Sequence, residues 1–221
     1  MPPSRPLLAM IHAVARSAEL ADAAVRERFP EAVPWHLFDG RLLEEVEHAG
    51  GLTPGLRSRM LRLIGHAFTE GADAVLLTCS SYGPVVEEAR RMWDRPIDRP
   101  DDALFDRVLR SGARRVALIC TSAAAVAPAV DGLAMAARSR DRPPEAVPLL
   151  CPTTSGAADA GALAARLAEA GVDAVALAQY SLAPLAGAVA AATGLSVHAG
   201  PEAAAGRLRA RLLGIEEEVD R

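Results

Sequence analysis

An internal repeat is the feature of this chain that most limits the folds available to it. The segment GADAVLLTCSSYGP at residues 71–84 aligns without a gap with GVDAVALAQYSLAP at residues 171–184, at an offset of 100 residues. The positions identical in both copies are Gly71/Gly171, Asp73/Asp173, Ala74/Ala174, Val75/Val175, Leu77/Leu177, Ser81/Ser181 and Pro84/Pro184. We infer that one supersecondary unit, a strand running into a helix, occurs twice.

The repeat extends over most of the chain. Three further pieces recur in the same order: EAVP at 31–34 and 145–148, LLAMIHAV from Leu7 against RVALICTS from Arg115, and PID at 96–98 against SVH at 196–198. The loops between the pieces differ in length. The shared order predicts two similar lobes of about a hundred residues each. We expect the first to hold residues 1–98 with 199–221 and the second to hold residues 99–198.

Apolar runs and helical segments alternate along the chain, which is typical of βαβ units and a parallel sheet. The predicted strands are Leu7 to Ala13, Val33 to Phe38, Ala74 to Thr78, Pro96 to Asp98, Arg115 to Cys120, Ala146 to Cys151, Ala174 to Ala178 and Ser196 to His198. The runs VALIC and AVLL are apolar at every position, which indicates strands that helices cover on both faces. With right-handed crossovers, the sequence predicts an α/β fold of two pseudo-symmetric, doubly wound lobes with parallel four-stranded sheets.

One segment has no counterpart in the second half. It lies between Phe38 and Thr53, and it is expected to be either a lid or an ornament. A helix is predicted to begin directly after it, because Thr53 is a suitable N-cap and Pro54 suits the first helical position.

Composition excludes several classes of function. All 24 basic residues are arginine, so neither a pyridoxal phosphate Schiff base nor a Walker A lysine is available, and we expect no cofactor. We find no metal-ligand spacing. The net charge of −4, the scattered arginines and the 4% aromatic content argue against a nucleic-acid partner, and no apolar run is long enough to span a membrane. Three cysteines without C-x-x-C pairing indicate a reducing, cytoplasmic location.

Cys79 is the leading candidate for chemistry. It lies in Thr78-Cys79-Ser80-Ser81, at the predicted turn from a buried strand to a helix beginning near Tyr82. The N-terminus of a helix lowers the pKa of a thiol and binds carboxylates, and both effects help a thiolate act on an anionic acid. The alternative is that Cys79 is a small buried residue at the end of a strand.

A thiol followed by small hydroxyl residues after the third strand, in a chain with a pseudo-symmetric second lobe, resembles the aspartate/glutamate/hydantoin racemase superfamily. The motifs LLTCSSYGP and VALAQYSLAP carry this resemblance. It implies a racemase that works without pyridoxal phosphate, a catalytic cysteine at Cys79, and a substrate carboxylate held by Thr78, Ser80 and Ser81. It also implies a possible homodimer.

The second motif departs from the superfamily's pattern at Gln179. Racemases of this superfamily hold one cysteine on each side of the substrate's α-carbon, and this chain offers Gln179 at the second place. Glutamine cannot act as an acid or base near neutral pH, so symmetrical two-thiol racemisation is not expected. His12, at the end of the first strand, is the first candidate for another catalytic base, and His198 is the second.

Other polar residues follow the predicted strands, at the edge where sheets of this kind bind ligands. The additional substrate-binding candidates are Thr121, Ser122, Tyr180, Ser181 and His198. By the repeat, His12 corresponds to Cys120 and His198 to Asp98. We expect Cys120 and Cys151 to be core residues.

The sequence thus predicts a cofactor-independent racemase-like or isomerase-like enzyme that acts at the α-carbon of a small carboxylic acid or amino acid through Cys79. A single-cysteine decarboxylase or a cis-trans isomerase of a dicarboxylate is the first alternative. A non-catalytic carboxylate-binding protein is the second. The expected partner is a small-molecule carboxylate.

Overall fold

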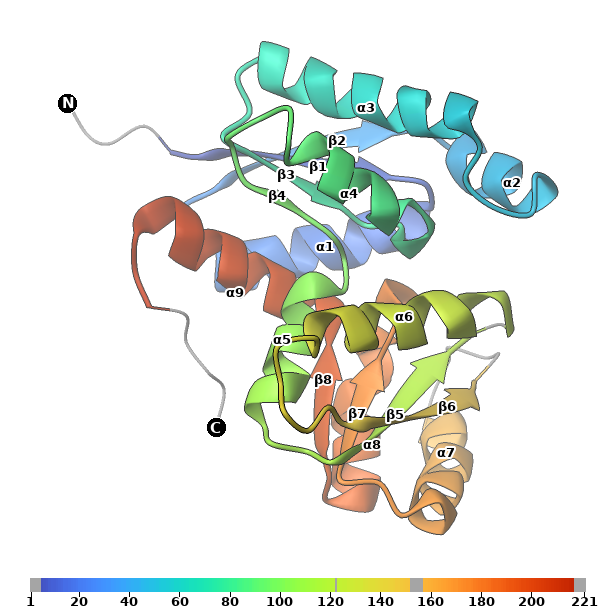
Figure 1. The fold of residues 1–221 in the computed structure, drawn as a ribbon. Helices are drawn as coiled ribbons and strands as arrows, with labels where there is room; N and C mark the ends of the chain where they lie inside the picture. The colour runs from blue at the N-terminus through green and yellow to red at the C-terminus, as the bar shows by residue number, and fades with distance from the viewer. Residues whose placement is uncertain (1–4, 122, 152–156, 217–221) are drawn as a thin grey trace. The chain divides into compact units, whose positions relative to one another are not determined.

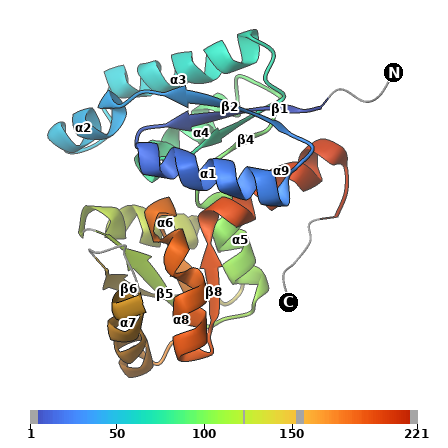
Figure 2. The same ribbon diagram turned by 180° about the vertical axis from the view of Figure 1, so that it is seen from behind.

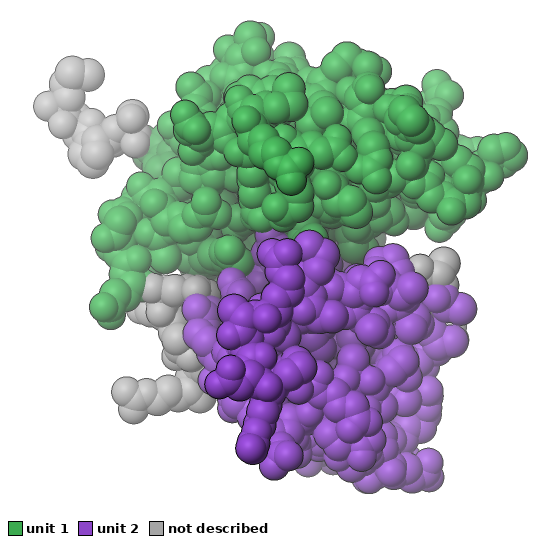
Figure 3. All heavy atoms as spheres, viewed as in Figure 1, with its two compact units in different colours: residues 1–100, 204–221 green, residues 101–203 purple. Residues whose placement is uncertain are grey.

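The computed structural model of the chain describes residues 5–121, 123–151 and 157–216. The chain divides into two compact units, which Figure 3 shows in different colours. Unit 1 holds residues 1–100 and 204–221, and unit 2 holds residues 101–203. The sequence prediction placed these two divisions after residues 98 and 198.

Each unit contains one parallel four-stranded sheet, in the order β2-β1-β3-β4 in unit 1 and β6-β5-β7-β8 in unit 2. The strands are β1 (Leu7–His12), β2 (Val33–Phe38), β3 (Ala74–Leu77), β4 (Ile97–Asp98), β5 (Arg115–Cys120), β6 (Glu145–Leu150), β7 (Ala174–Leu177) and β8 (Ser196–Ala199). All eight predicted strands are therefore confirmed, with ends that differ from the prediction by one residue at most.

Strand burial explains the apolar runs and the repeated EAVP. The residues of β3 and β7 are all buried, as their unbroken apolar sequences predict. β2 and β6 are edge strands, and each contains the proline of its EAVP copy, Pro34 or Pro148. Proline cannot donate to a β-ladder and is tolerated at a sheet edge, so the repeat places it where it does least harm.

Helices cover both faces of each sheet. They are α1 (Ala15–Arg28), α2 (Arg41–His48), α3 (Pro54–Thr69), α4 (Gly83–Ala89), α5 (Asp102–Arg110), α6 (Val126–Ala136), α7 (Ala157–Ala170), α8 (Ala186–Thr193) and α9 (Gly200–Leu213). Short 3-10 turns lead from a strand into α4, α6 and α8, and they are η1 (Ser80–Tyr82), η2 (Ala123–Ala125) and η3 (Tyr180–Leu185). In the part of the chain that the structure describes, no helix is both long and apolar enough to cross a bilayer.

In unit 1, α1 and α9 lie on one face of the sheet, and α2, α3 and α4 lie on the other (Figures 1 and 2). The odd-numbered side chains of β1 and β3, such as Ile11 and Leu77, enter the apolar cluster under α2, α3 and α4. Because side chains alternate along a strand, the even-numbered ones face α1. In unit 2, α5 and α6 pack on one face, and α7 and α8 pack on the other.

The segment that lacks a counterpart in the second half forms α2 and is part of the core. Leu42 is fully buried and Val46 is nearly so, in the same cluster as Met60 and Ile64 of α3. The next helix begins as predicted, with Pro54 in its first turn and the Thr53 hydroxyl oxygen accepting a hydrogen bond from the Leu56 N–H at 3.3 Å. The segment is therefore more than a surface ornament, because the amphipathic α2 buries its apolar side in unit 1.

Candidate functional site

Cys79 lies two residues beyond β3, in extended backbone that caps η1 and leads into α4. Its side chain is half-buried and packs against the apolar cluster of unit 1. Its carbonyl oxygen accepts a hydrogen bond from the Tyr82 N–H at 3.2 Å, which closes the turn. Ser80 and Ser81 in this turn are also half-buried. The strand end and the turn thus hold a thiol and two hydroxyls within three consecutive residues.

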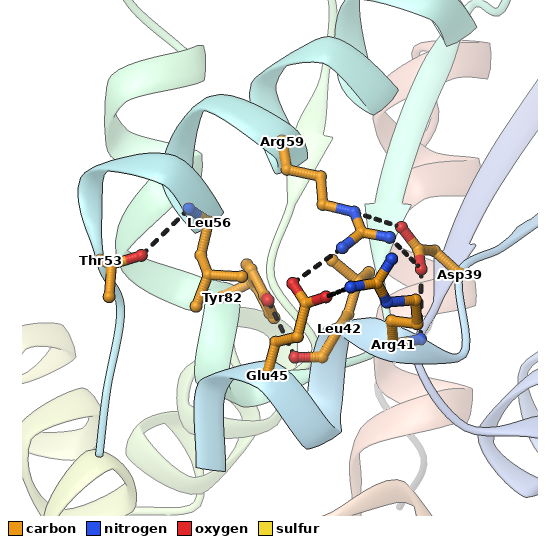
Figure 4. A network of polar contacts seen from close by, with 8 residues as sticks. All are labelled: Asp39, Arg41, Leu42, Glu45, Thr53, Leu56, Arg59 and Tyr82. Atoms are coloured by element: carbon orange, nitrogen blue, oxygen red, sulfur yellow. Dashed lines mark hydrogen bonds and ion pairs between the residues drawn. The ribbon is translucent and has the colours of Figure 1, made fainter. Parts of the chain in front are cut away.

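Tyr82 connects this turn to α2. The ring is fully buried, and its hydroxyl donates a hydrogen bond to the Leu42 carbonyl oxygen at 2.9 Å (Figure 4). Burial raises the pKa of Tyr82 to about 12, and the nearby Cys79 contributes to this rise. The phenol therefore stays protonated and remains a donor to α2 over the whole physiological range.

Arg59 of α3 fixes α2 from the other side, as Figure 4 shows. Its guanidinium contacts both carboxylate oxygens of Asp39, at 2.7 and 2.8 Å, and one of Glu45 at 2.8 Å. Arg41 adds an ion pair to the same Glu45. Arg41 is exposed, whereas Arg59, Asp39 and Glu45 are partly buried, and Arg59 bridges Asp39, two residues before α2, to the middle of this helix. We infer that α2 is a fixed wall on the face of the sheet toward which Cys79 points.

A chain of hydrogen bonds lies on the opposite face of the same sheet. The His12 Nδ1 is 2.9 Å from the Thr78 hydroxyl oxygen, and the His12 Nε2 is 3.0 Å from the His36 Nδ1. The His36 Nε2 is 3.1 Å from a carboxylate oxygen of Asp22 in α1. The chain runs from a buried threonine to an exposed histidine and a partly exposed carboxylate.

The protonation states of these groups bear on which group donates and which accepts in each of these hydrogen bonds. Burial is the main cause that lowers the pKa of His12 to about 4, and His36 lowers it further. A hydrogen bond from Arg26 lowers the pKa of Asp22, so this carboxylate is an acceptor. When His36 is neutral, it donates to Asp22 and accepts from His12, and His12 in turn accepts from Thr78. The single Thr78 hydroxyl proton is then directed to His12, and the Ile11 carbonyl oxygen, 3.3 Å from the same hydroxyl, is a competing acceptor.

The alternation of side chains separates this network from the thiol. His12 and Thr78 face each other across β1 and β3, one residue beyond the paired Ile11 and Leu77. Cys79, the next residue, points to the other face, where it packs against the cluster under α2, α3 and α4. Both ring nitrogens of His12 are occupied, and the Thr78 hydroxyl is 3.3 Å from the Ile11 carbonyl oxygen. The roles predicted for His12 and Thr78 stay predictions.

In unit 2, Gln179 occupies the place that Cys79 has in unit 1, two residues beyond the end of β7 and at the cap of η3. Its side-chain oxygen accepts two hydrogen bonds from Thr121, from the backbone N–H at 2.6 Å and from the hydroxyl at 2.8 Å. Thr121 follows β5 directly. The structure therefore brings two of the predicted site residues together at the carboxyl edge of this sheet.

The remaining candidates of unit 2 lie near the same edge. Tyr180 is buried, Ser181 is half-buried, and Ser122 lies outside the described residues. His198 lies on β8 and pairs with Ala176 of β7. Its equivalent position in the first half of the repeat is Asp98 of β4. Burial lowers the pKa of His198, and the charge of Arg107 lowers it further, so the neutral ring is favoured. Among the described residues, no group hydrogen-bonds its Nε2.

The other two cysteines are core residues, as predicted. Cys120 is fully buried and Cys151 is 7% exposed. Burial raises the pKa of Cys120 to about 11, which keeps its thiol protonated. Within residues 5–121, 123–151 and 157–216, no three His, Cys, Asp or Glu side chains gather as a metal site.

Sequence reasoning missed that His36 and Asp22 belong to the chain of hydrogen bonds that begins at Thr78 and His12. Neither residue belongs to a motif that the sequence singles out. The available signal was the strand register, because β1 and β2 pair Met10 with His36 and so put His36 on the face of His12. That signal depends on knowing which strands are neighbours.

Comparisons with known proteins agree with this architecture. A family model described as Asp/Glu/Hydantoin racemase matches residues 7–208. None of the curated protein sequences compared with the chain matches it.

Solved structures of several enzymes are similar in fold. A glutamate racemase from Francisella tularensis in complex with D-glutamate is 12% identical with a TM-score of 0.67, covering 96% of this chain and 81% of that one. An allantoin racemase from Klebsiella pneumoniae is 18% identical with a TM-score of 0.68, covering 96% and 90%. An unliganded arylmalonate decarboxylase is 19% identical with a TM-score of 0.63, covering 95% and 93%. At these identities the likeness shows the fold alone.

Proposed function

This chain belongs to the Asp/Glu/Hydantoin racemase family, and from that premise we propose that it is a cofactor-independent enzyme acting at the α-carbon of a small carboxylic acid or amino acid. Cys79 is the proposed catalytic group. The observation that carries the proposal is the place of this thiol, half-buried at the carboxyl end of a central strand, where sheets of this kind bind their ligands. Cys120 and Cys151 are in the core and take no part.

The turn around Cys79 supplies suitable partners for a carboxylate. Ser80 and Ser81 offer hydroxyl donors in the residues directly after the thiol. Tyr82 and Arg59 hold the turn and α2 in place, and they act through the position of the backbone. We assign the binding of the substrate carboxylate in unit 1 to Ser80 and Ser81.

The proposed chemical step is proton transfer at carbon. The Cys79 thiolate takes the α-hydrogen as an S–H proton, and the electron pair of the C–H bond passes to the substrate's carboxylate as an enediolate. Return of this proton to the same face gives exchange without inversion. Inversion needs a donor on the other face, and Gln179 cannot supply one.

The substitution at Gln179 favours reactions that need one thiol. A decarboxylase uses a single acid, because loss of carbon dioxide creates the enediolate that Cys79 then protonates. The fold shared with an arylmalonate decarboxylase supports this alternative. Addition of Cys79 to the double bond of a dicarboxylate, followed by rotation and elimination, is the cis-trans isomerase alternative. A non-catalytic carboxylate-binding protein is the third, favoured by the hydrogen bonds that hold Gln179 to Thr121.

We place the enzyme in the cytoplasm. The support for this is the sequence, in which three cysteines lie far apart without C-x-x-C pairing.

Proton NMR in deuterated water tests the proposal. D- and L-glutamate, D- and L-aspartate, allantoin and phenylmalonate are incubated with the enzyme, and α-hydrogen signals and chirality are followed. Exchange with inversion means racemisation, exchange with retention means one-thiol proton transfer, and release of carbon dioxide means decarboxylation.

Cys79→Ala is expected to lower the rate about 100-fold or more, because the proton-transfer group is lost. Cys151→Ala removes a buried thiol and is the matched control, with its rate unchanged. Full activity of Cys79→Ala would exclude Cys79 as the catalytic group. Binding of a compound from the same set without any turnover would favour the carboxylate-binding protein.

A further inference from the structure

Gln179 replaces a thiol at a position that the fold repeats. Cys79 and Gln179 both lie two residues beyond the third strand of their sheets and both cap a 3-10 turn. The residue across from each differs. Beyond the paired Ile11 and Leu77, Cys79 is opposite Ala13, which has no polar side chain, whereas Gln179 is opposite Thr121.

The hydrogen bonds from Thr121 determine which way the amide of Gln179 points. The oxygen and the nitrogen of a side-chain amide are hard to tell apart by shape, so their positions are assigned from the hydrogen bonds they make. Here the atom 2.6 Å from the backbone nitrogen of Thr121 must be the oxygen, because a backbone N–H only donates. The Thr121 hydroxyl donates to the same oxygen at 2.8 Å. The amide nitrogen of Gln179 is therefore directed away from Thr121.

This orientation leaves the two N–H donors of Gln179 available. Its half-buried side chain stands at the carboxyl edge of β5 and β7, and among the described residues none accepts a hydrogen bond from its amide nitrogen. The oxygen, which could otherwise repel an anion, is occupied by Thr121. What the side chain presents is a fixed, uncharged pair of donors, and such a pair suits an anionic oxygen.

We propose that Gln179, held by Thr121, donates a hydrogen bond to a carboxylate oxygen of the ligand and so orients it. The choice of a carboxylate rests on the proposed function. Gln179 is then a specificity-determining residue that binds where relatives with two thiols have their second base. Thr121 is a positioning residue that acts through Gln179. No proton is transferred at this position.

The sequence offers an unusually direct test. Gln179 is the only glutamine in the chain, and the chain has no asparagine. Every carboxamide NH2 correlation in a proton–nitrogen spectrum of the untagged protein therefore belongs to Gln179, and the guanidinium groups of arginine resonate at other nitrogen frequencies. Acetate, the simplest carboxylate, is titrated into the full-length protein, with sodium chloride at equal ionic strength as the control. We expect the NH2 signals to move downfield and saturate with acetate but not with chloride. Signals that do not respond to acetate, or respond equally to chloride, would overturn the proposal.

Variants separate the donor from the surrounding structure. Gln179→Glu keeps an oxygen that can accept from Thr121 but removes both donors and adds a negative charge. We expect it to abolish the acetate-dependent shifts of the backbone amides of Tyr180 and Ser181. Unchanged shifts in this variant would contradict the proposal.

Thr121→Val removes one hydrogen bond to the Gln179 oxygen and should raise the acetate dissociation constant about threefold or more. Thr193→Val is its control in unit 2, because it removes hydrogen bonds of a threonine hydroxyl away from Gln179, one to the Val189 carbonyl oxygen and one from the Leu195 N–H. Its acetate affinity should equal that of the unmodified protein. An equal loss of acetate affinity in both variants would mean that Thr121 has no specific role in positioning Gln179.

These results are independent of the test of Cys79. Acetate binding at Gln179 needs no turnover, and Cys79→Ala should retain it. Acetate shifts together with full activity of Cys79→Ala would support the role of Gln179 and exclude that of Cys79. Loss of turnover in Cys79→Ala without acetate shifts at Gln179 would give the opposite outcome.

Discussion

At the scale of single residues, the two copies of the repeated motif carry different polar side chains at the ends of their strands. In unit 1 the polar pair across the strands is His12 and Thr78, on the face of α1. In unit 2 the polar pair is Thr121 and Gln179, one position further along and on the opposite face. The place that holds a thiol in unit 1 thus holds an amide in unit 2, and each has its own hydrogen-bonded surroundings.

His12 should make the stability of the protein depend on pH. The pKa of His12 is about 4 in the folded protein and ordinarily 6.5, so between these values the unfolded chain binds a proton that the folded protein does not. Stability therefore falls as the pH falls through this window, by about 2 kcal/mol between pH 7 and pH 5. Urea unfolding at the two pH values measures this difference.

The matched variants for this prediction are His12→Val and His48→Asn. His12→Val should weaken the pH dependence, whatever its stability at pH 7, because the titrating group is gone. His48 is exposed in the last turn of α2, and its replacement should leave the dependence as it was. An NMR titration in which the His12 ring becomes protonated above pH 6 would show the explanation to be wrong.

At the scale of elements, α2 is a wall that buried contacts and charges hold in place. The Tyr82 hydroxyl reaches the Leu42 carbonyl oxygen from the turn after Cys79, and Arg59 bridges Asp39 and Glu45. An insertion that contributed only surface would need none of these contacts. The geometry of the Cys79 turn therefore depends on a helix that the second half of the chain lacks.

Tyr82→Phe should lower the free energy of unfolding by about 1–2 kcal/mol, because it leaves the Leu42 carbonyl oxygen without its side-chain partner. Arg59→Met should be coupled to it, since both residues hold α2, and the double variant measures the coupling. Thr69→Val removes an exposed hydrogen bond within α3 and serves as the control, with a change below about 0.5 kcal/mol. If all three substitutions changed the free energy of unfolding by equally small amounts, and the changes were additive, Tyr82 and Arg59 would not hold α2 in place.

At the scale of the whole molecule, the two units are connected in different ways along the chain. Unit 2 is continuous in sequence and has an apolar cluster on each face of its sheet. Unit 1 includes residues 204–213 of α9, in which Leu208 is fully buried. Arg211 contacts Asp98 at 2.6 Å, and Arg209 contacts Glu31 at 2.7 Å.

Ending the chain after Ala203 should therefore unfold or strongly destabilise unit 1 and spare unit 2. The truncation also removes Arg207 and Arg211 from the buried Asp98, which keeps its contact with Arg90 at 3.2 Å, and the lost ion pairs add to the destabilisation. Both tryptophans, Trp35 and Trp93, belong to unit 1, so their fluorescence reports on this unit during urea unfolding.

The isolated fragment of residues 101–203 should keep helical circular dichroism and a cooperative thermal transition. The isolated fragment of residues 1–100 is the comparison, and it should show neither a stable transition nor native tryptophan emission. A stable fragment 1–100 would mean that α9 is dispensable for unit 1.

The sequence by itself determined the elements of this protein and the likeness of its halves. The apolar runs predicted all eight strands, Thr53 and Pro54 predicted the start of α3, and the repeat aligned Cys79 with Gln179. These features depend on local periodicity, on the conformation of single residues and on similarity between segments, and all of these are visible in one dimension.

Only the tertiary structure decided which polar groups meet. The contact of His36 with His12, the hold of Thr121 on Gln179 and the packing of Tyr82 against α2 join residues that are between 24 and 58 positions apart. Whether such residues meet depends on which strands are neighbours, on their register and on the face each side chain takes. A shift of register by one residue would move the side chains on the strands, such as His12 and His36, to the opposite face, and the position of α2 against Tyr82 depends on packing between distant segments.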